Sequence, residues 1–237
     1  MKAALLAELR AARAARRPVV LATWLDGDRQ ALWSSGDGPA GLAEAAARAL
    51  ARDQAEVVDT ADGRVFLEPH NPPRRLVLVG AVHIAQPLSA MAGLAGFAVT
   101  VVDPRTAFAT EARFPGVPLV TEWPDEGLRG LGLDPRAAVV TLTHDPKLDD
   151  PGLLVALASP AFYVGCLGSR KTHAARLERI TAAGVEASAL ARLRGPVGLR
   201  IGATSPAEIA VSILGEIIAA LRGVEPPRGP AQATAPT

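Results

Sequence analysis

The stretch Leu76–Ala85, with the sequence LVLVGAVHIA, decides the fold of the chain. Four consecutive apolar residues end at Gly80, and a segment compatible with a helix follows. A strand that lacks polar alternation is typical of a parallel sheet whose two faces are both covered by helices. A glycine directly after such a strand is typical of the first turn of a Rossmann-type domain. The stretch therefore predicts the start of a doubly wound parallel sheet.

Three more short apolar runs follow the first one, again rich in β-forming residues and without polar alternation. They are Ala98–Val102, Ala137–Leu142 and Ala161–Val164. The segments between these runs are helical in pattern, and strands that alternate with helices indicate a parallel sheet. We therefore predict the α/β class, with a Rossmann-like doubly wound parallel sheet preceded by a small α+β N-terminal domain.

Signals for helix starts lie between and after these runs. Asp149-Asp150-Pro151 offers a capping aspartate followed by proline in the first turn. Ser205-Pro206-Ala207-Glu208 has the spacing of a capping box with proline at the first helical position. The helix predicted there ends at Gly223 and repeats an apolar residue on one face. The repeated residues are Ile209, Ile213, Ile217 and Leu221.

Two breaks in composition divide the chain. The first is the polar, proline-rich stretch HNPPRR at residues 70–75, which suits a linker, and the second follows Gly223. The segment after Gly223 is too rich in proline and too poor in large apolar residues to fold. We assign a small α+β domain to residues 1–70, a linker to 71–75, a Rossmann-like domain to 76–223 and a disordered tail to 224–237.

Within the first domain no residue pattern points to chemistry. The pattern predicts an initial helix, an alanine-rich helix and four short strands, with Asp26-Gly27-Asp28 as a hairpin turn. The second helix is expected at 41–52 and the strands at 18–24, 30–33, 55–59 and 65–68.

Composition excludes several classes of function. Aromatic residues make up only 4% of the chain, too few for a surface that stacks nucleic-acid bases, and the net charge of +1 attracts neither DNA nor an acidic membrane. The single cysteine, Cys166, excludes an intramolecular disulfide and a multi-cysteine metal site. The sequence has neither an apolar run of membrane-spanning length nor a secretory signal. We therefore expect a cytoplasmic protein without nucleic-acid partner or membrane span.

Four loops follow the predicted strands, where helix N-termini offer unpaired N–H groups to anions. The first loop contains Gly80, His83 and Ile84. A dinucleotide fingerprint requires a second glycine where Val82 stands, and the β-branched side chain obstructs a pyrophosphate, which disfavours intact NAD. His83 lies at the helix start, where it either bonds a ligand phosphate or pterin edge or is capped by its own backbone.

The second and third loops carry charged side chains. Asp103 lies 23 residues after Gly80, near the position of a ribose-binding acid. Arg105 either meets a phosphate through two hydrogen bonds or pairs with Asp103. Thr143-His144-Asp145 brings a hydroxyl, an imidazole and a carboxylate together, and we expect His144 to bond ligand while Asp145 caps the next helix. We assign no metal, because His83 and His144 lie in separate loops without a ligand spacing.

The fourth loop is the best phosphate cradle in the sequence. Gly168-Ser169-Arg170-Lys171 combines backbone flexibility, a hydroxyl and two adjacent cations at a helix start. Gly202 and Thr204, at the start of the last helix, can close the far side. Cys166 is either a small buried core residue or, if exposed beside the two cations, a thiolate that ligates a soft metal or carries sulfur.

Taken together and in this order, the loops are similar to those of the XdhC/CoxI family, accessory proteins of molybdenum hydroxylases such as xanthine dehydrogenase and carbon monoxide dehydrogenase. The resemblance covers essentially everything from Leu76 to Gly223. The matching stretches are Leu78–Ala85, Val101–Arg105, Thr143–Asp145, Gly168–Thr172 and Pro196–Ala210.

The resemblance implies a C-terminal Rossmann domain that binds the molybdenum cofactor, a molybdopterin bearing a phosphate or, as a dinucleotide, a nucleotide. It implies a maturation chaperone rather than an enzyme, one that holds the cofactor, assists its sulfuration and delivers it to an apo molybdenum hydroxylase. A cysteine desulfurase and a second copy of the chain are the further partners considered. The expected cofactor-binding residues are Gly80, His83, Ile84, Asp103, Arg105, Thr143, His144, Asp145, Gly168, Ser169, Arg170, Lys171, Gly202 and Thr204.

The sequence departs from the family at two places. Val82 stands where a glycine is usual, and the N-terminal half lacks the family's glycine-rich stretch with a cysteine followed by glutamate. Two alternatives therefore stay open. One is an NAD(P)- or nucleotide-binding oxidoreductase or transferase on the same fold, which Asp103 favours and Val82 disfavours. The other is a regulatory or interaction module that has kept only the fold.

Overall fold

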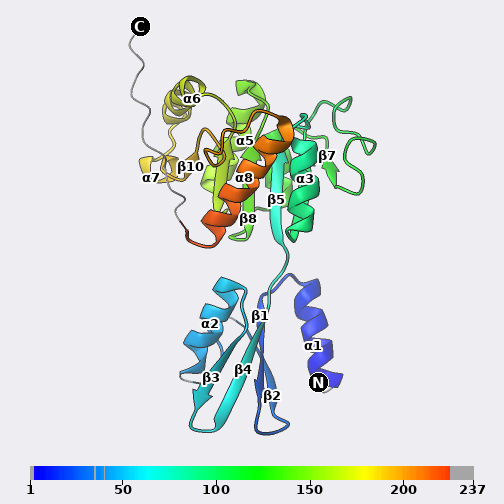
Figure 1. Cartoon of the computed structure of the whole chain (residues 1–237), viewed down its shortest axis with the longest axis vertical. Coiled ribbons are helices and arrows are strands. Elements are labelled where there is room, and N and C mark those ends of the chain that lie inside the picture. The colour runs from blue at the N-terminus through cyan, green and yellow to red at the C-terminus, as the bar shows by residue number, and fades with distance from the viewer. Residues whose placement is uncertain (1–2, 35, 40, 225–237) are drawn as a thin grey trace. The chain divides into compact units, whose positions relative to one another are not determined.

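The computed structural model describes residues 3–34, 36–39 and 41–224. The tail predicted at 224–237 lies outside the described residues, apart from Val224. The chain divides into two compact units between Pro72 and Pro73. Each unit has its own sheet (Figure 1).

The first unit is a four-stranded antiparallel sheet with two helices. The strands are ordered β2-β1-β4-β3, so β1 and β4 pair at the centre. Residues alternate between the two faces of a strand. Accordingly, Val20 and Ala22 of β1 pack with α2, whereas Val19 packs with α1. The elements are α1 (Ala3–Ala14), β1 (Val19–Trp24), β2 (Gln30–Ser34), α2 (Leu42–Arg52), β3 (Glu56–Thr60) and β4 (Gly63–His70).

The second unit is a six-stranded parallel sheet in the order β10-β9-β8-β5-β6-β7. The chain enters at the central strand β5, moves outward to β7 and then crosses back to β8, which is the strand order of a Rossmann fold. The elements are β5 (Arg74–Val79), α3 (Ala85–Leu94), β6 (Phe97–Val102), β7 (Leu119–Val120), α4 (Pro124–Leu131), β8 (Ala137–Thr141), α5 (Pro146–Ala158), β9 (Tyr163–Cys166), α6 (Arg170–Ala182), α7 (Ala187–Leu190), β10 (Leu193–Arg194) and α8 (Pro206–Leu221).

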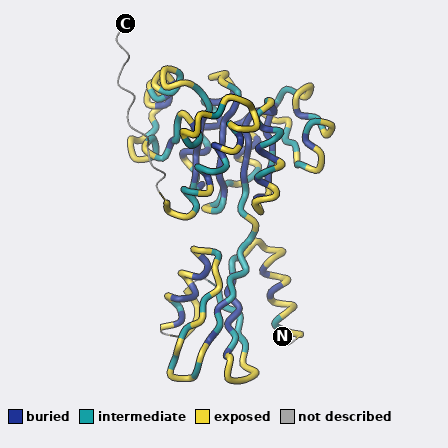
Figure 2. The backbone as a smooth tube through the Cα atoms, viewed as in Figure 1, coloured by how far each residue is buried: buried dark blue, intermediate teal, exposed yellow. Residues whose placement is uncertain are grey.

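Helices cover both faces of this sheet, and the sequence of β5 shows why. Leu76 and Leu78 pack with α3 and α8, whereas Val77 and Val79 pack on the other face with α4, α5 and α6. A strand enclosed on both faces requires an apolar residue at every position. Buried residues are accordingly concentrated in the sheet, and exposed residues lie in loops and on outer helix faces (Figure 2). The predicted fold class is confirmed.

Helix α5 begins earlier than we expected from Asp149-Asp150-Pro151. Its N-cap is Asp145, whose Oδ1 accepts a hydrogen bond from the N–H of Lys147 at 2.9 Å, and the helix begins at Pro146. Proline fits this first position because the residue there has no intrahelical N–H bond to lose. Pro151 therefore lies inside the helix, and Asp149 is buried instead of capping.

Strand β5 begins at Arg74, so two residues that we assigned to the linker belong to the sheet. The guanidinium of Arg75 donates to the carbonyl oxygens of Leu131 at 2.8 Å and Gly132 at 2.6 Å, and it pairs with Asp134 at 3.1 Å. The C-terminus of a helix favours a nearby cation, and α4 ends at Leu131. This contact explains how an arginine fits into the strand.

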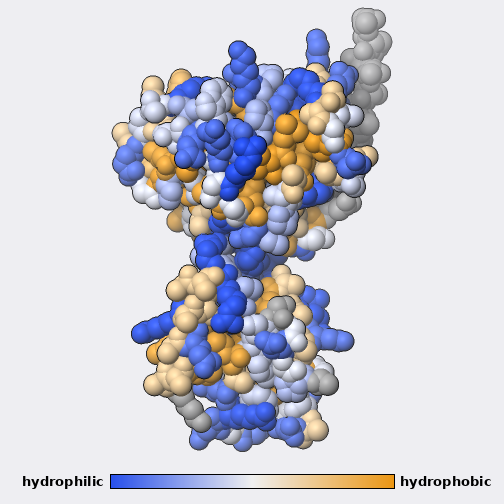
Figure 3. Space-filling view, turned by 180° about the vertical axis from the view of Figure 1, so that it is seen from behind, coloured by the Kyte–Doolittle hydropathy of each residue, from blue (hydrophilic) through white to orange (hydrophobic). Residues whose placement is uncertain are grey.

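The surface of the second unit mixes charged and apolar side chains. Seen from behind, an apolar area is exposed on this unit among charged side chains (Figure 3). A groove of about 390 Å³ is lined by Arg129 of α4 and by residues of α5 and its end, Leu154, Val155, Ala158 and Ser159. Of the helices in the described ranges, none is both long and apolar enough to cross a membrane.

Candidate functional site

The predicted site residues follow the carboxyl ends of the parallel strands. Strand order reverses between β5 and β8, and the crevice outside this reversal is where Rossmann folds bind ligands. Gly80, with a φ of +111°, directly follows β5, and a Cβ added to it would lie 2.5 Å from Cγ2 of Thr143. The loops after β5 and β8 therefore touch at this point, and only glycine fits there.

The loop after β5 leaves a histidine exposed. His83 lies in the turn before α3, and within the described part of the chain its ring has no hydrogen-bond partner. Ile84 is the N-cap of α3 and, like Val82, is half-buried against the sheet core. The first turn of α3 has neither a side-chain cap nor an acidic residue. His83 and this helix start are thus open to a ligand, whereas Ile84 contributes through packing.

The carboxylate of Asp103 is bonded within its own chain, which disfavours the predicted role as a ribose ligand. It is 1% exposed, and its carboxylate accepts hydrogen bonds from the N–H of Ala81 at 2.7 Å and from Nε and Nη2 of Arg105 at 2.9 and 2.7 Å. Burial opposes ionisation, but the bonds from Arg105 and Ala81 outweigh it and hold the pKa of Asp103 below its ordinary value. The pairing with Arg105 that we left open is the arrangement found.

A buried carboxylate, that of Asp149, stabilises the loop after β8 through hydrogen bonds. Asp149 accepts hydrogen bonds from the N–H and hydroxyl of Thr143 at 3.3 and 2.7 Å, and from the N–H of His144 at 3.1 Å. These bonds hold His144 at a φ of +66°, in the left-handed region, with its side chain exposed. Thr143 and Asp145 are therefore used in shaping the loop, and His144 is the side chain it presents to solvent.

The loop after β9 keeps an open helix N-terminus with two cations. Ser169 is the N-cap of α6, and its hydroxyl accepts the N–H of Thr172 at 3.1 Å. Arg170 and Lys171 occupy the first turn, are exposed, and have no ion-pair partner among the described residues. Cations oppose the helix dipole at this end, so an anion bound here would relieve an unfavourable arrangement. Gly168–Lys171 thus lead into and begin α6, and their role as a phosphate cradle stays a prediction.

The start of α8, in contrast, is filled by the chain's own carboxylate. Oε2 of Glu208 accepts the N–H of Ser205 at 2.9 Å and the N–H and hydroxyl of Thr204 at 2.8 and 3.0 Å. The hydrogen bonds from Ser205 and Thr204 lower the pKa of Glu208 to about 2. The predicted capping box is confirmed. It disfavours the role that we gave Thr204, because its N–H and hydroxyl already donate to Glu208.

The thiol of Cys166 is buried, which excludes the exposed thiolate that we considered. The residue is 0% exposed, and its Sγ lies 3.5 Å from both Nδ1 of His173 and the carbonyl oxygen of Arg194. Burial raises the pKa of the Cys166 thiol to about 11. A thiol that is both enclosed and protonated is a poor metal ligand and sulfur carrier.

The sequence did not predict the buried ion pair of this region, which Asp149 of α5 forms with Arg176 of α6. Their side chains are 0% and 1% exposed, and Nη2 of Arg176 lies 3.2 Å from Oδ2 of Asp149. A signal was available for Arg176. It lies four residues before Ile180, so it falls on the same face of α6 as this buried residue.

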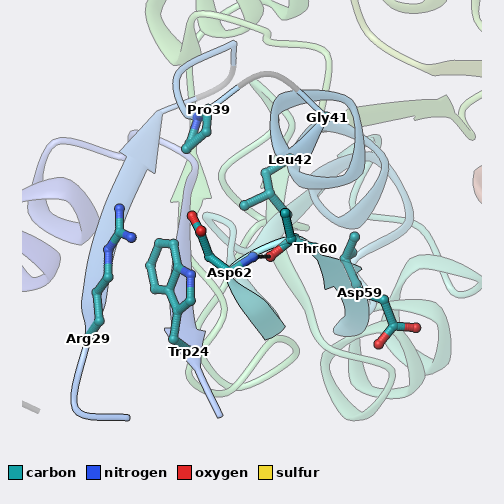
Figure 4. Close-up of a pocket in the computed structure, with 10 residues that line it drawn as sticks. Trp24, Arg29, Pro39, Gly41, Leu42, Asp59, Thr60 and Asp62 are labelled. Carbon is teal, nitrogen blue, oxygen red and sulfur yellow. Dashed lines mark hydrogen bonds between the residues drawn. The ribbon is translucent and has the colours of Figure 1, made fainter. Parts of the chain in front are cut away.

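Two cavities differ in their relation to the predicted residues. One of about 470 Å³ lies beside the loop after β9 and is lined by Leu167, Gly202 and part of α8. The other, of about 310 Å³, lies within the first unit, between the indole of Trp24 and the turn at Thr60–Asp62 (Figure 4). Only the first contains a predicted site residue, Gly202. In the described residues, no three His, Cys, Asp or Glu side chains gather as a metal site.

Comparison with known proteins agrees with this geometry. The model of the XdhC Rossmann domain family matches residues 76–217. A probable xanthine dehydrogenase subunit of Bacillus subtilis (strain 168) is 36% identical over 155 residues, which are 65% of this chain and 45% of that protein. The molybdenum cofactor insertion chaperone PaoD of Escherichia coli (strain K12) is 34% identical over 85 residues, which are 36% of this chain and 27% of PaoD.

The chain spans less than half the length of either curated relative. A crystal structure from Bacillus halodurans, described as a xanthine dehydrogenase, is similar with a TM-score of 0.71. The similarity covers 92% of this chain and 66% of that one at 22% identity, and it shows the fold alone. The family match extends from the first residues of the parallel sheet nearly to the end of its last helix, and it shows that the chain belongs to the XdhC family.

Proposed function

We propose that the chain binds the molybdenum cofactor as cargo and acts as an accessory protein in the maturation of a molybdenum hydroxylase. The observation that carries this proposal is the open N-terminus of α6, where Gly168, Arg170 and Lys171 lie together at the ligand edge of an XdhC-family Rossmann sheet. The name of the relative PaoD, a molybdenum cofactor insertion chaperone, supports the choice of cargo.

The residues at this edge suit an anionic pterin. The phosphate of the cargo suits the first turn of α6, because unpaired backbone N–H groups lie there and two cationic residues occupy the same turn. The exposed rings of His83 and His144 belong to the two loops that touch at Gly80 and Thr143, and each offers a nitrogen to the polar edge of a pterin. When delivered, the cofactor supplies the molybdenum chemistry of the recipient enzyme, while this chain only holds and orients it.

The burial of Cys166 bears on sulfuration. A buried thiol with a pKa of about 11 does not carry sulfur readily, and it is the only cysteine in the sequence. We therefore propose that sulfur reaches the bound cofactor from a partner of the cysteine desulfurase class. The loaded chain would then deliver the cofactor to an apo hydroxylase, as a chaperone rather than as an enzyme.

The test is anaerobic binding of isolated molybdenum cofactor to the wild-type chain and to R170A/K171A. We expect saturable binding that the double substitution weakens by about tenfold or more, because two charge-assisted contacts to a phosphate are lost. R179A is the matched control. It removes a cation from the last turn of the same helix, where the residue pairs with Asp150, and it should bind as the wild type does.

Either of two results would contradict the proposal. One is the absence of saturable binding by folded wild-type protein, and the other is equal binding by R170A/K171A and wild type. An NADH fluorescence titration on the same samples addresses the nucleotide-dependent alternative. We expect no saturable signal, because the carboxylate of Asp103 is already bonded to Ala81 and Arg105.

A further inference from the structure

A buried ion pair lies beneath the two loops of the candidate site. Asp149 of α5 and Arg176 of α6 are 0% and 1% exposed in their side chains, with Oδ2 and Nη2 3.2 Å apart. Neither residue can touch a ligand directly in this arrangement. Any role in binding must therefore act through the loops that the two side chains contact.

Each member of the pair holds one loop. Asp149 accepts the backbone N–H groups of Thr143 and His144, in the loop after β8. Arg176 donates from Nη2 to the carbonyl oxygen of Leu167 at 3.1 Å, in the loop after β9. The 3.2 Å contact between the two charges thus joins the loop that presents His144 to the loop that opens α6.

Stability alone does not account for this pair. Nε and Nη1 of Arg176 are buried without a hydrogen-bond partner among the described residues, and each buried donor left in this way is unfavourable. Burial also raises the pKa of Asp149, although bonds from Thr143 and the charge of Arg176 oppose this. Apolar side chains of similar volume commonly match or exceed the stability of such a pair.

Nη1, one of the two unpartnered nitrogens of Arg176, lies beside Gly168 of the proposed phosphate site. A Cβ added to Gly168 would lie 3.6 Å from Nη1 of Arg176, so the glycine of the cradle packs directly over the guanidinium. Gly168 has a φ of +146°, which a residue with a side chain rarely adopts. The guanidinium thus supports the backbone that leads into the first turn of α6.

We propose that Asp149 and Arg176 are a positioning pair that fixes the spacing between the His144 loop and the Gly168 loop, so that one ligand is gripped by both. The identity of the ligand, the molybdenum cofactor, rests on the proposed function. The spacing itself is a property of the ligand-free protein. Loss of the pair separates the loops even where the sheet beneath them stays folded.

The test compares wild type with the neutral double variant D149N/R176M. Removing both charges leaves no buried charge unpaired, so the sheet is expected to stay folded with a urea midpoint close to that of wild type. Affinity for the molybdenum cofactor should fall by about tenfold or more, and the backbone N–H of His144 should exchange with solvent faster. Arg176→Lys keeps a cation but places its single nitrogen about one bond short of Nη2, the atom that contacts both Asp149 and Leu167. It provides the same test if the double variant does not fold.

The control is D150N/R179M, which neutralises an ion pair between the same two helices at the surface, with Nε and Oδ2 2.5 Å apart. It should leave both affinity and His144 exchange unchanged. Cofactor affinity equal to wild type in a folded D149N/R176M, or unchanged exchange at His144, would overturn the inference. Failure of the wild type to bind cofactor refutes the proposed function instead, and exchange at His144 still decides whether the pair sets the loop.

Discussion

Replacing Asp103 by asparagine separates a structural role of this residue from a role in ligand binding. The carboxylate is buried and accepts hydrogen bonds from the backbone N–H groups of Ala81 and Arg105, at 2.7 and 2.9 Å, and from two nitrogens of the Arg105 guanidinium. It therefore ties the end of β6 to the first turn after β5. Asparagine has nearly the same shape but carries no charge.

The expected loss follows from these contacts. Asparagine keeps one acceptor oxygen, and its NH₂ group faces donors that the second carboxylate oxygen had bonded. Hydrogen bonds to a charged group contribute about 1.5–3 kcal/mol each. The side chain of Arg105 is 38% exposed, so water replaces some of the hydrogen bonds that its guanidinium loses. We expect D103N to lower the free energy of unfolding by about 2–4 kcal/mol, and the melting temperature by roughly 5–15 °C for a domain of this size.

Urea unfolding followed by circular dichroism, with thiol protection of Cys166 as a second probe of the same sheet, measures this loss. D125N is the matched control, because Asp125 pairs with Arg129 at the surface of α4 and should contribute less than about 1 kcal/mol. A D103N variant that unfolds at the wild-type urea concentration would refute the structural reading. If the wild type bound NADH, against our expectation, and D103N lost that affinity, the ribose-binding role would be restored.

Two further predictions concern titratable groups. The pKa of Glu208 is about 2 in the folded chain, below its ordinary value of 4.5, so its ionised form stabilises the fold above about pH 4.5, and this contribution disappears as the pH falls towards 2. E208Q should therefore be less stable than wild type at pH 7 and equal to it near pH 2, and a pH-independent difference in urea midpoint would contradict this. Cys166 should react with a thiol reagent at pH 8 at least ~100-fold more slowly in the native chain than in urea, and rapid native labelling would show that the thiol is exposed.

The fold was predictable because its signals are local. The continuous apolar runs of β5 and β8 reflect burial on both faces, which each strand records in its own sequence. The two-residue strands β7 and β10 leave no such record, because their place in the sheet depends on the neighbouring strands. Arg75 was assigned to the linker for a related reason. Its place in β5 depends on the carbonyl oxygens at the end of α4, which are 56 residues or more away along the chain.

The site was predicted less completely, because residue type does not show what a polar side chain is bonded to. Asp103 had the right spacing for a ribose ligand, yet its carboxylate is taken by Arg105 two residues on. Asp149 was interpreted as a helix cap, and only the tertiary contact with Arg176 shows it as a buried acceptor. For Arg176, in contrast, helical spacing alone predicts the position on the buried face of α6.

The two helix starts at Ser169 and Ser205 show which part of anion binding sequence can decide. Both begin with a serine N-cap, and both were assigned to the cofactor. The two helices differ in their third residue. In α8 this residue is Glu208, whose carboxylate accepts hydrogen bonds from the free N–H groups at the helix start. In α6 it is Thr172, which has no carboxylate. An acidic residue at this position fills the helix N-terminus, whereas the cations Arg170 and Lys171 leave it in need of an anion. The identity of the third helical residue, which the sequence alone provides, therefore favours Gly168–Lys171 as an anion site and excludes Thr204 from it.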